Sequence, residues 1–188
     1  MKEGVKLPAV TFKTRVRDES VGGPNPFRWQ DVTTEELWGK GRHVIFSLPG
    51  AFTPTCSTYQ LPGFEALSKE PGESGHGRLA DLSVDTISCV SVNDAFVMNC
   101  WAKDQELENV KVIPDGSGTF TRQLGMLVDK DNLGFGYRSW RYAMVVTDGV
   151  IEKWFEEPGR EDNHGDDPYG ETSPETVLTY LESAVAYV

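Results

Sequence analysis

The sequence predicts an α/β fold in which helices cover a mixed β-sheet. Apolar segments of strand length alternate with segments of helical periodicity between residues 43 and 126. Two alternating segments joined at Asp148-Gly149, a dipeptide typical of a β-hairpin turn, follow them. Alternating strands and helices favour parallel neighbours, whereas a hairpin adds an antiparallel pair. The 188 residues suffice for one sizeable core, so we expect a single domain over residues 1–188.

The first elements are a strand, a loop, a short helix and a buried strand. Residues 9–16 alternate apolar and polar side chains, which predicts an edge strand, and residues 17–28 are rich in glycine and proline, which predicts a loop. Thr33 and Glu36 fit a capping box at the start of a short helix. Residues 43–48 (HVIFSL) are predicted to form a buried strand that ends at Pro49.

A helix is predicted after Cys56, with Leu61, Phe64 and Leu67 at helical spacing and a kink at Pro62. The elements that follow are predicted in chain order: a polar loop at 69–78, a buried strand at 86–92, a helix capped by Asn93, a strand at 111–114, a short helix at 119–126 and the hairpin at 141–155. An acidic loop at 156–171 leads to a last helix, with Ser173 or Thr172 as its cap and Pro174 in its first turn.

Composition excludes several classes of function. The net charge of −11 and the pI of about 4.7 disfavour nucleic acid and anionic membrane surfaces as partners. The apolar segments are too short to span a bilayer, and the amino terminus lacks the apolar segment of a secretory signal. Three widely spaced cysteines fit neither a disulfide framework nor a zinc site. We therefore expect a cytoplasmic protein without a bound metal.

Cys56 is the residue whose sequence surroundings most clearly indicate a reactive site. A strand ends at residue 48, a turn follows, and Cys56 enters the first turn of the next helix, where free backbone N–H groups and the helix dipole favour a thiolate. Such a thiolate is a nucleophile at the end of the sheet where α/β folds hold ligands. The alternative is a buried cysteine that packs as a small hydrophobe. The polar neighbours Thr53, Thr55 and Ser57 favour the nucleophile.

A cysteine nucleophile needs a group that generates or stabilises its thiolate. A Cys/His hydrolase would need a histidine base, but His43 begins a strand at the opposite end from Cys56, and His76 and His164 lie in polar loops. A fixed cation is therefore favoured over a histidine. Arg138 and Arg141 are both candidates; an ordinary solvated arginine is the alternative for each, and spacing alone does not decide.

The segment Pro49–Cys56 (PGAFTPTC) matches the P-x-x-x-T-x-x-C motif of the peroxiredoxins. The wider segment PGAFTPTCSTYQLPGF resembles the type II, peroxiredoxin-5-like subgroup, including the peroxiredoxin halves of bacterial peroxiredoxin–glutaredoxin hybrids. The resemblance continues through CVSVNDAFVMNCWAKD, IPDGSGTFTRQLGM, GFGYRSWRYAMVV and DGVIEKWFEEPG, and it covers roughly residues 5–185.

This resemblance implies a thioredoxin fold and thiol-dependent reduction of hydrogen peroxide and alkyl hydroperoxides, without a cofactor. It implies that Cys56 is the peroxidatic cysteine, which becomes a sulfenic acid. Thr53 orients the peroxide and hydrogen-bonds the thiolate, Pro49 shields the sulfur from water, and Arg141 is the active-site arginine. The backbone amides of Thr55 and Cys56 would hold the peroxide oxygens. Arg138 does not match a site position and is expected to be structural.

The chain departs from relatives that resolve the sulfenic acid with a second, late cysteine, because no cysteine follows Cys100. Cys89 lies in an apolar strand and is expected in the core, and Cys100 is not expected to reach Cys56. We therefore expect a one-cysteine mechanism with an external thiol: glutathione with glutaredoxin as the first choice, thioredoxin as the second. A non-catalytic redox sensor or holdase with the same fold is the alternative function.

The resemblance also implies a homodimer that forms beside the active site. Phe52, Phe135 and Trp140 are candidates for its apolar contact, with ordinary core packing as the alternative for each. The loops at 17–28, 69–78 and 159–171 are longer than the compact family pattern, and we expect them to affect access to the site or oligomer contacts.

Overall fold

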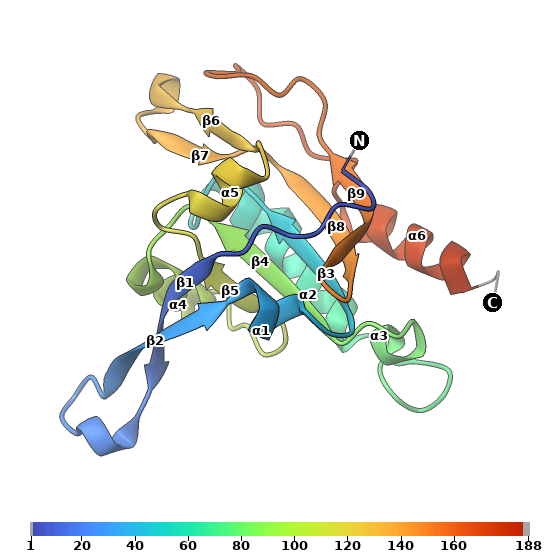
Figure 1. Ribbon diagram of the computed structural model, residues 1–188, viewed down its shortest axis with the longest axis horizontal. Coiled ribbons are helices and arrows are strands. Elements are labelled where there is room, and N and C mark those ends of the chain that lie inside the picture. The colour runs from blue at the N-terminus through green and yellow to red at the C-terminus, as the bar shows by residue number, and fades with distance from the viewer. Residues whose placement is uncertain (1, 186–188) are drawn as a thin grey trace.

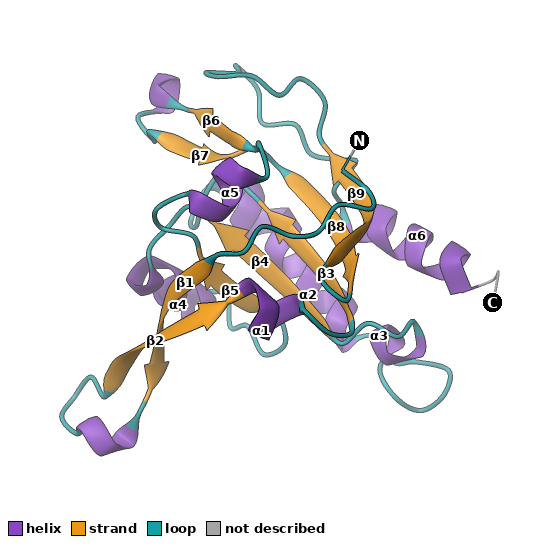
Figure 2. Ribbon diagram, viewed as in Figure 1, coloured by secondary structure: helices purple, strands orange, loops and turns teal. Residues whose placement is uncertain are grey.

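A computed structural model describes residues 2–185 and contains a central five-stranded sheet with the strand order β5-β4-β3-β8-β9. Its strands are β3 (Arg42–Ser47), β4 (Thr86–Ser91), β5 (Lys111–Pro114), β8 (Tyr142–Thr147) and β9 (Val150–Glu156). The pairs β3–β4 and β4–β5 are parallel, and the pairs β3–β8 and β8–β9 are antiparallel. The predicted mixed sheet and the predicted α/β class are therefore confirmed (Figures 1 and 2).

Helices and smaller elements cover both faces of this sheet. The helices are α1 (Thr34–Trp38), α2 (Leu61–Lys69), α3 (Arg78–Asp81), α4 (Ala95–Asp104), α5 (Thr119–Gln123) and α6 (Pro174–Val185). Successive strand residues point to opposite faces: Val44 and Phe46 pack in one core with α2, α4 and α6, whereas Ile45 packs in a second core with α1 and α5. No helix within residues 2–185 combines the length and apolar character needed to cross a bilayer.

The amino-terminal region differs from its prediction. Strand β1 (Thr11–Arg17) pairs antiparallel with β2 (Phe27–Thr33) in a separate two-stranded ribbon that projects from the body (Figure 1). The edge strand predicted at 9–16 is thus not part of the central sheet, and the predicted loop at 17–28 spans the turn of the ribbon, including the 3₁₀ turn η1 (Glu19–Val21). Much of β2 is exposed, so it carries no alternating pattern that sequence reasoning can detect.

Two further elements were missed or misassigned. Strands β6 (Leu127–Asp129) and β7 (Tyr137–Ser139) form a small antiparallel sheet around the 3₁₀ turn η3 (Asp131–Leu133). The predicted helix cap at Asn93 is wrong. Asp94 caps α4 by accepting from the amide of Val97 at 2.9 Å.

Several local predictions are confirmed. Thr33 and Glu36 form the capping box of α1. The β8–β9 hairpin turns at Asp148 and Gly149, with φ of 48° and 75°, as a type I′ turn requires. Ser173, rather than Thr172, caps α6 by accepting from the amide of Thr176 at 3.2 Å.

A buried carboxylate ties α2 to the connection between α4 and β5. Glu65 accepts hydrogen bonds from the amides of Glu108, Asn109 and Val110, at 3.0, 3.2 and 2.8 Å. Burial alone would raise the pKa of Glu65, but these hydrogen bonds outweigh it and the pKa is lowered. A carboxyl with a lowered folded-state pKa stabilises the fold above its unfolded-state pKa and loses that contribution as pH falls through the folded-state value.

Glu65→Gln is therefore expected to lower the free energy of unfolding at neutral pH by about 1–3 kcal/mol. The difference from wild type should shrink as pH falls through the pKa that Glu65 has in the folded protein. Urea unfolding at several pH values measures this. The control is Glu70→Gln, which alters an exposed carboxyl without a hydrogen-bond partner among the described residues. A difference for Glu65→Gln that stays constant into strongly acidic solution would contradict the role given to its charge.

Candidate active site

The register of the central sheet brings together the segment that contains Cys56 and the segment that contains Arg141. Ser47, the last residue of β3, pairs with Tyr142, the first residue of β8. The segment that leaves β3 toward Cys56 therefore lies beside the segment that enters β8 through Arg141. An antiparallel neighbour makes this possible because the end of one strand lies against the start of the other.

Cys56 lies in the first turn of a helix, as predicted. The helix begins at Pro54, and its first backbone hydrogen bond runs from the amide of Ser57 to the carbonyl of Thr53 at 3.0 Å. Pro54 occupies the first helical position, where a missing N–H costs nothing. The amides of Thr55 and Cys56 precede the first bonded amide, so they have no carbonyl of their own helix to bind.

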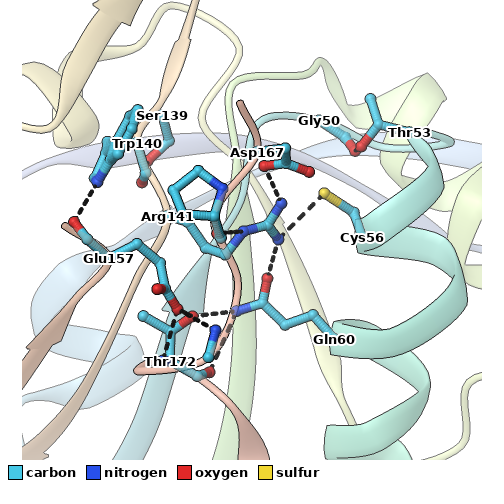
Figure 3. Close-up of polar contacts among 12 residues, drawn as sticks. Gly50, Thr53, Cys56, Gln60, Ser139, Trp140, Arg141, Glu157, Asp167 and Thr172 are labelled. Carbon is cyan, nitrogen blue, oxygen red and sulfur yellow. Dashed lines mark hydrogen bonds and ion pairs between the residues drawn. The ribbon is translucent and has the colours of Figure 1, made fainter. Parts of the chain in front are cut away.

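The helix then makes a widened turn directly before Pro62, the residue at which a kink was predicted. Residues Cys56–Gln60 form the π-helical segment η2, in which the amide of Leu61 donates to the carbonyl of Cys56. Pro62 lies in the first turn of α2, directly after it. Proline supplies no N–H, and the change of hydrogen-bond register directly before it accommodates that loss. Residues four apart share a helix face, so the side chains of Cys56 and Gln60 point the same way (Figure 3).

The sulfur of Cys56 faces the guanidinium of Arg141. Both side chains are buried, with 0% and 1% of their surface exposed. Arg141 Nη1 donates to Cys56 Sγ at 3.5 Å. Cys56 also touches the core beneath α2, so it is both packed and paired with a cation. Of the two arginines considered from the sequence, Arg141 is the one that contacts the sulfur.

Arg141 is enclosed by further acceptors from the helix that carries Cys56 and from the acidic loop (Figure 3). Its Nη1 also donates to Gln60 Oε1, its Nη2 to Asp167 Oδ1 at 2.6 Å, and its Nε to the carbonyl of Pro168 at 3.2 Å. Burial alone would lower the pKa of Arg141, but the charges of Cys56 and Asp167 outweigh burial and raise it. The guanidinium is therefore a permanent cation held in one orientation beside the sulfur.

Arg138 holds the loop before Cys56 and is not an ordinary solvated arginine. Its Nη1 donates to the carbonyl of Pro49 at 3.3 Å and its Nε to the carbonyl of Phe135 at 3.2 Å. Burial lowers its pKa, against the opposing charge of Cys56. A Cβ atom at position 50 would overlap Arg138 Nη1, so Gly50 provides the space that the contact needs. Arg138 thus has the structural position expected for it.

Thr53 lies near Cys56, but its hydroxyl group forms a hydrogen bond with Gly50 and not with Cys56. Thr53 Oγ1 donates to the carbonyl of Gly50 at 2.8 Å, and no hydrogen bond joins it to Cys56 within the described chain. The predicted bond from Thr53 to the thiolate is therefore not formed. A hydroxyl whose hydrogen is used keeps two lone pairs, so Thr53 presents an acceptor, not a donor, to a ligand.

A cavity of about 360 Å³ opens beside these residues. One side comes from the segment before and within the first helical turn: Pro49, Thr53, Pro54 and Thr55. The other sides come from the connection between β6 and β7 and from the acidic loop: Lys130, Leu133, Phe135 and residues 164–167. Gln60, Asp167 and Pro168 were not predicted as site residues, because a single amide, carboxylate or backbone carbonyl among many polar groups has no distinguishing pattern.

The comparisons with known proteins agree with this geometry. A model of the family described as Redoxin matches residues 2–169. The chain is 59% identical over 178 residues to a peroxiredoxin from Rhizobium etli, covering 95% of each chain. It is 49% identical over 179 residues to the hybrid peroxiredoxin hyPrx5 from Haemophilus influenzae, covering 95% of this chain and 66% of that one. The chain belongs to the peroxiredoxins.

A solved structure of the Plasmodium falciparum antioxidant protein, a 1-Cys peroxiredoxin, matches with a TM-score of 0.84 at 32% identity, covering 97% of this chain and 99% of that chain. The protein thus has the thioredoxin fold and is a thiol peroxidase, as the sequence resemblance implied.

The other two cysteines of this peroxiredoxin, Cys89 and Cys100, differ in their burial. Cys89, in β4, is fully buried in the core that also holds Cys56, and burial raises the pKa of its thiol. Cys100 is exposed on α4. Residues 2–185 hold no cluster of three His, Cys, Asp or Glu side chains with the geometry of a metal site.

The aromatic residues proposed for a dimer contact differ in position. Trp140 is 2% exposed and donates from Nε1 to the carbonyl of Glu157 at 2.8 Å, so of its two alternatives, dimer contact and core packing, the structure favours core packing. Phe135 is half-buried beneath Arg138. Phe52 is 50% exposed, with a φ of 63° that is rare for a bulky residue.

Thr53→Val is expected to slow the reaction of this peroxiredoxin with hydrogen peroxide by roughly 100-fold or more, because it removes an oriented polar group from the reacting centre. Thr53→Ser keeps the hydroxyl and should stay within a few-fold of wild type. Stopped-flow oxidation measures the effect, and alkylation of Cys56 by iodoacetamide is the control, since alkylation needs the thiolate but no oriented peroxide. Equal slowing of both reactions would contradict a role in peroxide binding.

Proposed function

We propose that Cys56 is the peroxidatic cysteine and that hydrogen peroxide and alkyl hydroperoxides are its substrates. The single observation that carries this proposal is the contact of 3.5 Å between Arg141 Nη1 and Cys56 Sγ in a buried site. The adjoining cavity is lined by both apolar and polar groups, which suits peroxides that carry a small organic group as well as hydrogen peroxide.

The proposed reaction is an in-line displacement at oxygen. The Cys56 thiolate attacks one peroxide oxygen, an S–O bond forms, the O–O bond breaks, and the leaving oxygen takes a proton to become water or an alcohol. Negative charge moves from sulfur toward the leaving oxygen. Arg141 and the free amides of the first helical turn are fixed before the reaction, so they stabilise this charge without reorganising. The peroxide is reduced, and Cys56 is oxidised to a sulfenic acid.

We propose that an external thiol then resolves the sulfenic acid. Its sulfur bonds to Cys56 Sγ as water leaves, and a second thiol releases Cys56 and forms the external disulfide. Cys89 is a poor resolving group because its buried thiol is held in the protonated form. The similar structure from Plasmodium falciparum is that of a 1-Cys peroxiredoxin, which supports this mechanism. We propose glutathione with glutaredoxin as the first reductant, in line with the similarity to the hybrid peroxiredoxin, and thioredoxin as the second.

This chemistry consumes reduced thiols, so we propose that the protein works in antioxidant defence and redox homeostasis in the cytoplasm, where thiols are kept reduced. We propose further that residues 1–188 form a single domain, since elements from both ends of the described chain pack on one sheet. The exposed aromatic ring of Phe52 beside the active site supports a homodimer.

Cys56→Ser is the substitution that tests the proposed function. Wild type should be oxidised by hydrogen peroxide orders of magnitude faster than a free thiol, and Cys56→Ser should abolish that reaction while Cys100→Ser leaves it unchanged. Stopped-flow tryptophan fluorescence follows the oxidation. Sustained peroxide consumption with glutathione and glutaredoxin, compared with thioredoxin, identifies the reductant. Rapid oxidation without turnover by any thiol would favour a redox sensor, and slow oxidation would overturn the proposal.

Phe52→Asn is expected to weaken the proposed dimer. Asparagine tolerates a positive φ better than phenylalanine, so the loop should keep its conformation while the aromatic contact is lost. Sedimentation velocity across a range of protein concentrations measures the change. Val21→Asn, which replaces a residue 54% exposed in the turn of the β1–β2 ribbon, is the matched control. A dimer that persists unchanged in Phe52→Asn would exclude this contact.

A further inference from the structure

Residues 159–171 of the acidic loop are hydrogen-bonded to other parts of the protein near both ends. At the start, Asp162 accepts from the amide of Asp129 in β6 at 2.8 Å. At the end, the buried carboxylate of Glu157 accepts from the amides of Gly170 and Thr172, at 2.8 and 2.9 Å. The residues between these anchors are therefore held over the active site.

The anchored loop places Asp167 against the active-site cation. The Asp167 side chain is 41% exposed, yet its Oδ1 lies 2.6 Å from Nη2 of Arg141, whose side chain is 1% exposed. The other terminal nitrogen of the same guanidinium contacts Cys56 Sγ at 3.5 Å. One delocalised positive charge thus has an anionic partner on each side: a carboxylate at Nη2 and the proposed thiolate at Nη1 (Figure 3).

We propose that Asp167 is a positioning residue that partly neutralises the positive charge of Arg141 and thereby sets the nucleophilicity of the Cys56 thiolate. The proposal rests on the function proposed for Cys56. It gives the acidic loop a role in the reaction itself, through Arg141 and without contact between Asp167 and the sulfur.

The charged and titratable groups that face Cys56 come from each element around it. Arg141, which precedes β8, contacts the sulfur at 3.5 Å. Arg138 of β7 makes no hydrogen bond to the sulfur, and the charge of Cys56 opposes the lowering of its pKa by burial. Cys89 of β4 lies behind it as a neutral thiol. Asp167 is the carboxylate that pairs with Arg141. A thiolate that cations stabilise too strongly forms readily but attacks slowly, because nucleophilicity falls as basicity falls. A carboxylate on the far side of Arg141 limits that stabilisation.

The charge of Asp167, rather than its capacity to hold Arg141, is the decisive property. Gln60 and the carbonyl of Pro168 also fix the guanidinium, and its burial leaves little freedom. Asp167→Asn keeps a side-chain oxygen that accepts from Nη2 and removes only the charge. Asp167→Glu keeps the charge on a longer side chain.

The test measures iodoacetamide alkylation of Cys56 as a function of pH, read by mass spectrometry of the peptide that contains Cys56. Asp167→Asn should move the alkylation midpoint to lower pH by about 0.5–1 unit. The limiting rate at high pH should fall roughly two- to threefold, and the limiting rate of peroxide oxidation should fall with it. Asp167→Glu should keep both values near wild type. Glu171→Gln, which removes an exposed charge of the same loop without a partner among the described residues, should change neither.

A midpoint that stays unchanged or rises in Asp167→Asn would overturn the proposal, since a purely structural contact would slow the reaction without lowering the midpoint. Equal shifts in Asp167→Asn and Glu171→Gln would also overturn it, because the effect would then belong to the loop as a whole. Alkylation involves no peroxide, so it tests this inference separately from the proposed function, which fails if hydrogen peroxide oxidises the wild type slowly or if Cys56→Ser still reacts rapidly with it.

Discussion

The burial of one guanidinium group is the constraint on which the site depends. A buried cation is tolerated only where acceptors surround it, because leaving it unpaired costs several kcal/mol. Arg141 obtains its acceptors from separate segments: Cys56 and Gln60 from one helix, and Asp167 and Pro168 from the acidic loop. The helix positions the first two acceptors, and the anchored loop positions the other two. The helix, the start of β8 and the loop must therefore come together for the arginine to be satisfied, so the same contacts that stabilise the fold also assemble the reactive centre.

The sheet topology makes this meeting possible. Strand β8 lies between β3 and β9 and runs antiparallel to both, so its first residues lie where β3 ends and where β9 ends. The end of β3 leads to Cys56, and the end of β9 leads through Glu157 into the acidic loop. Arg141, directly before β8, consequently lies close to both connections. The antiparallel addition to a parallel sheet thus places a cation between a nucleophile and an acidic segment.

Sequence reasoning predicted the strands of the core and the positions of Cys56 and Arg141, because continuous apolar segments and a dense motif are local signals. It missed β2, which is too exposed to show a period of two, and it assigned the cap of α4 to Asn93 instead of Asp94. It also missed Asp167. Nothing distinguishes that carboxylate from the others in its loop until the chain has folded, since its role comes from a partner 26 residues earlier in the chain. Long-range pairing by single polar residues has no periodic signature.

The geometry also explains why few residue types are compatible with the positions of the segment 49–56. Gly50 leaves room for Arg138, whose guanidinium binds the carbonyl of Pro49. Thr53 closes the turn through its hydroxyl and supplies the first carbonyl of the helix. Several positions of the motif therefore act on the backbone and not on the reacting atoms. A motif that combines structural and chemical requirements within eight residues leaves few alternatives, and this is the physical reason that it can be recognised from sequence when Asp167 cannot.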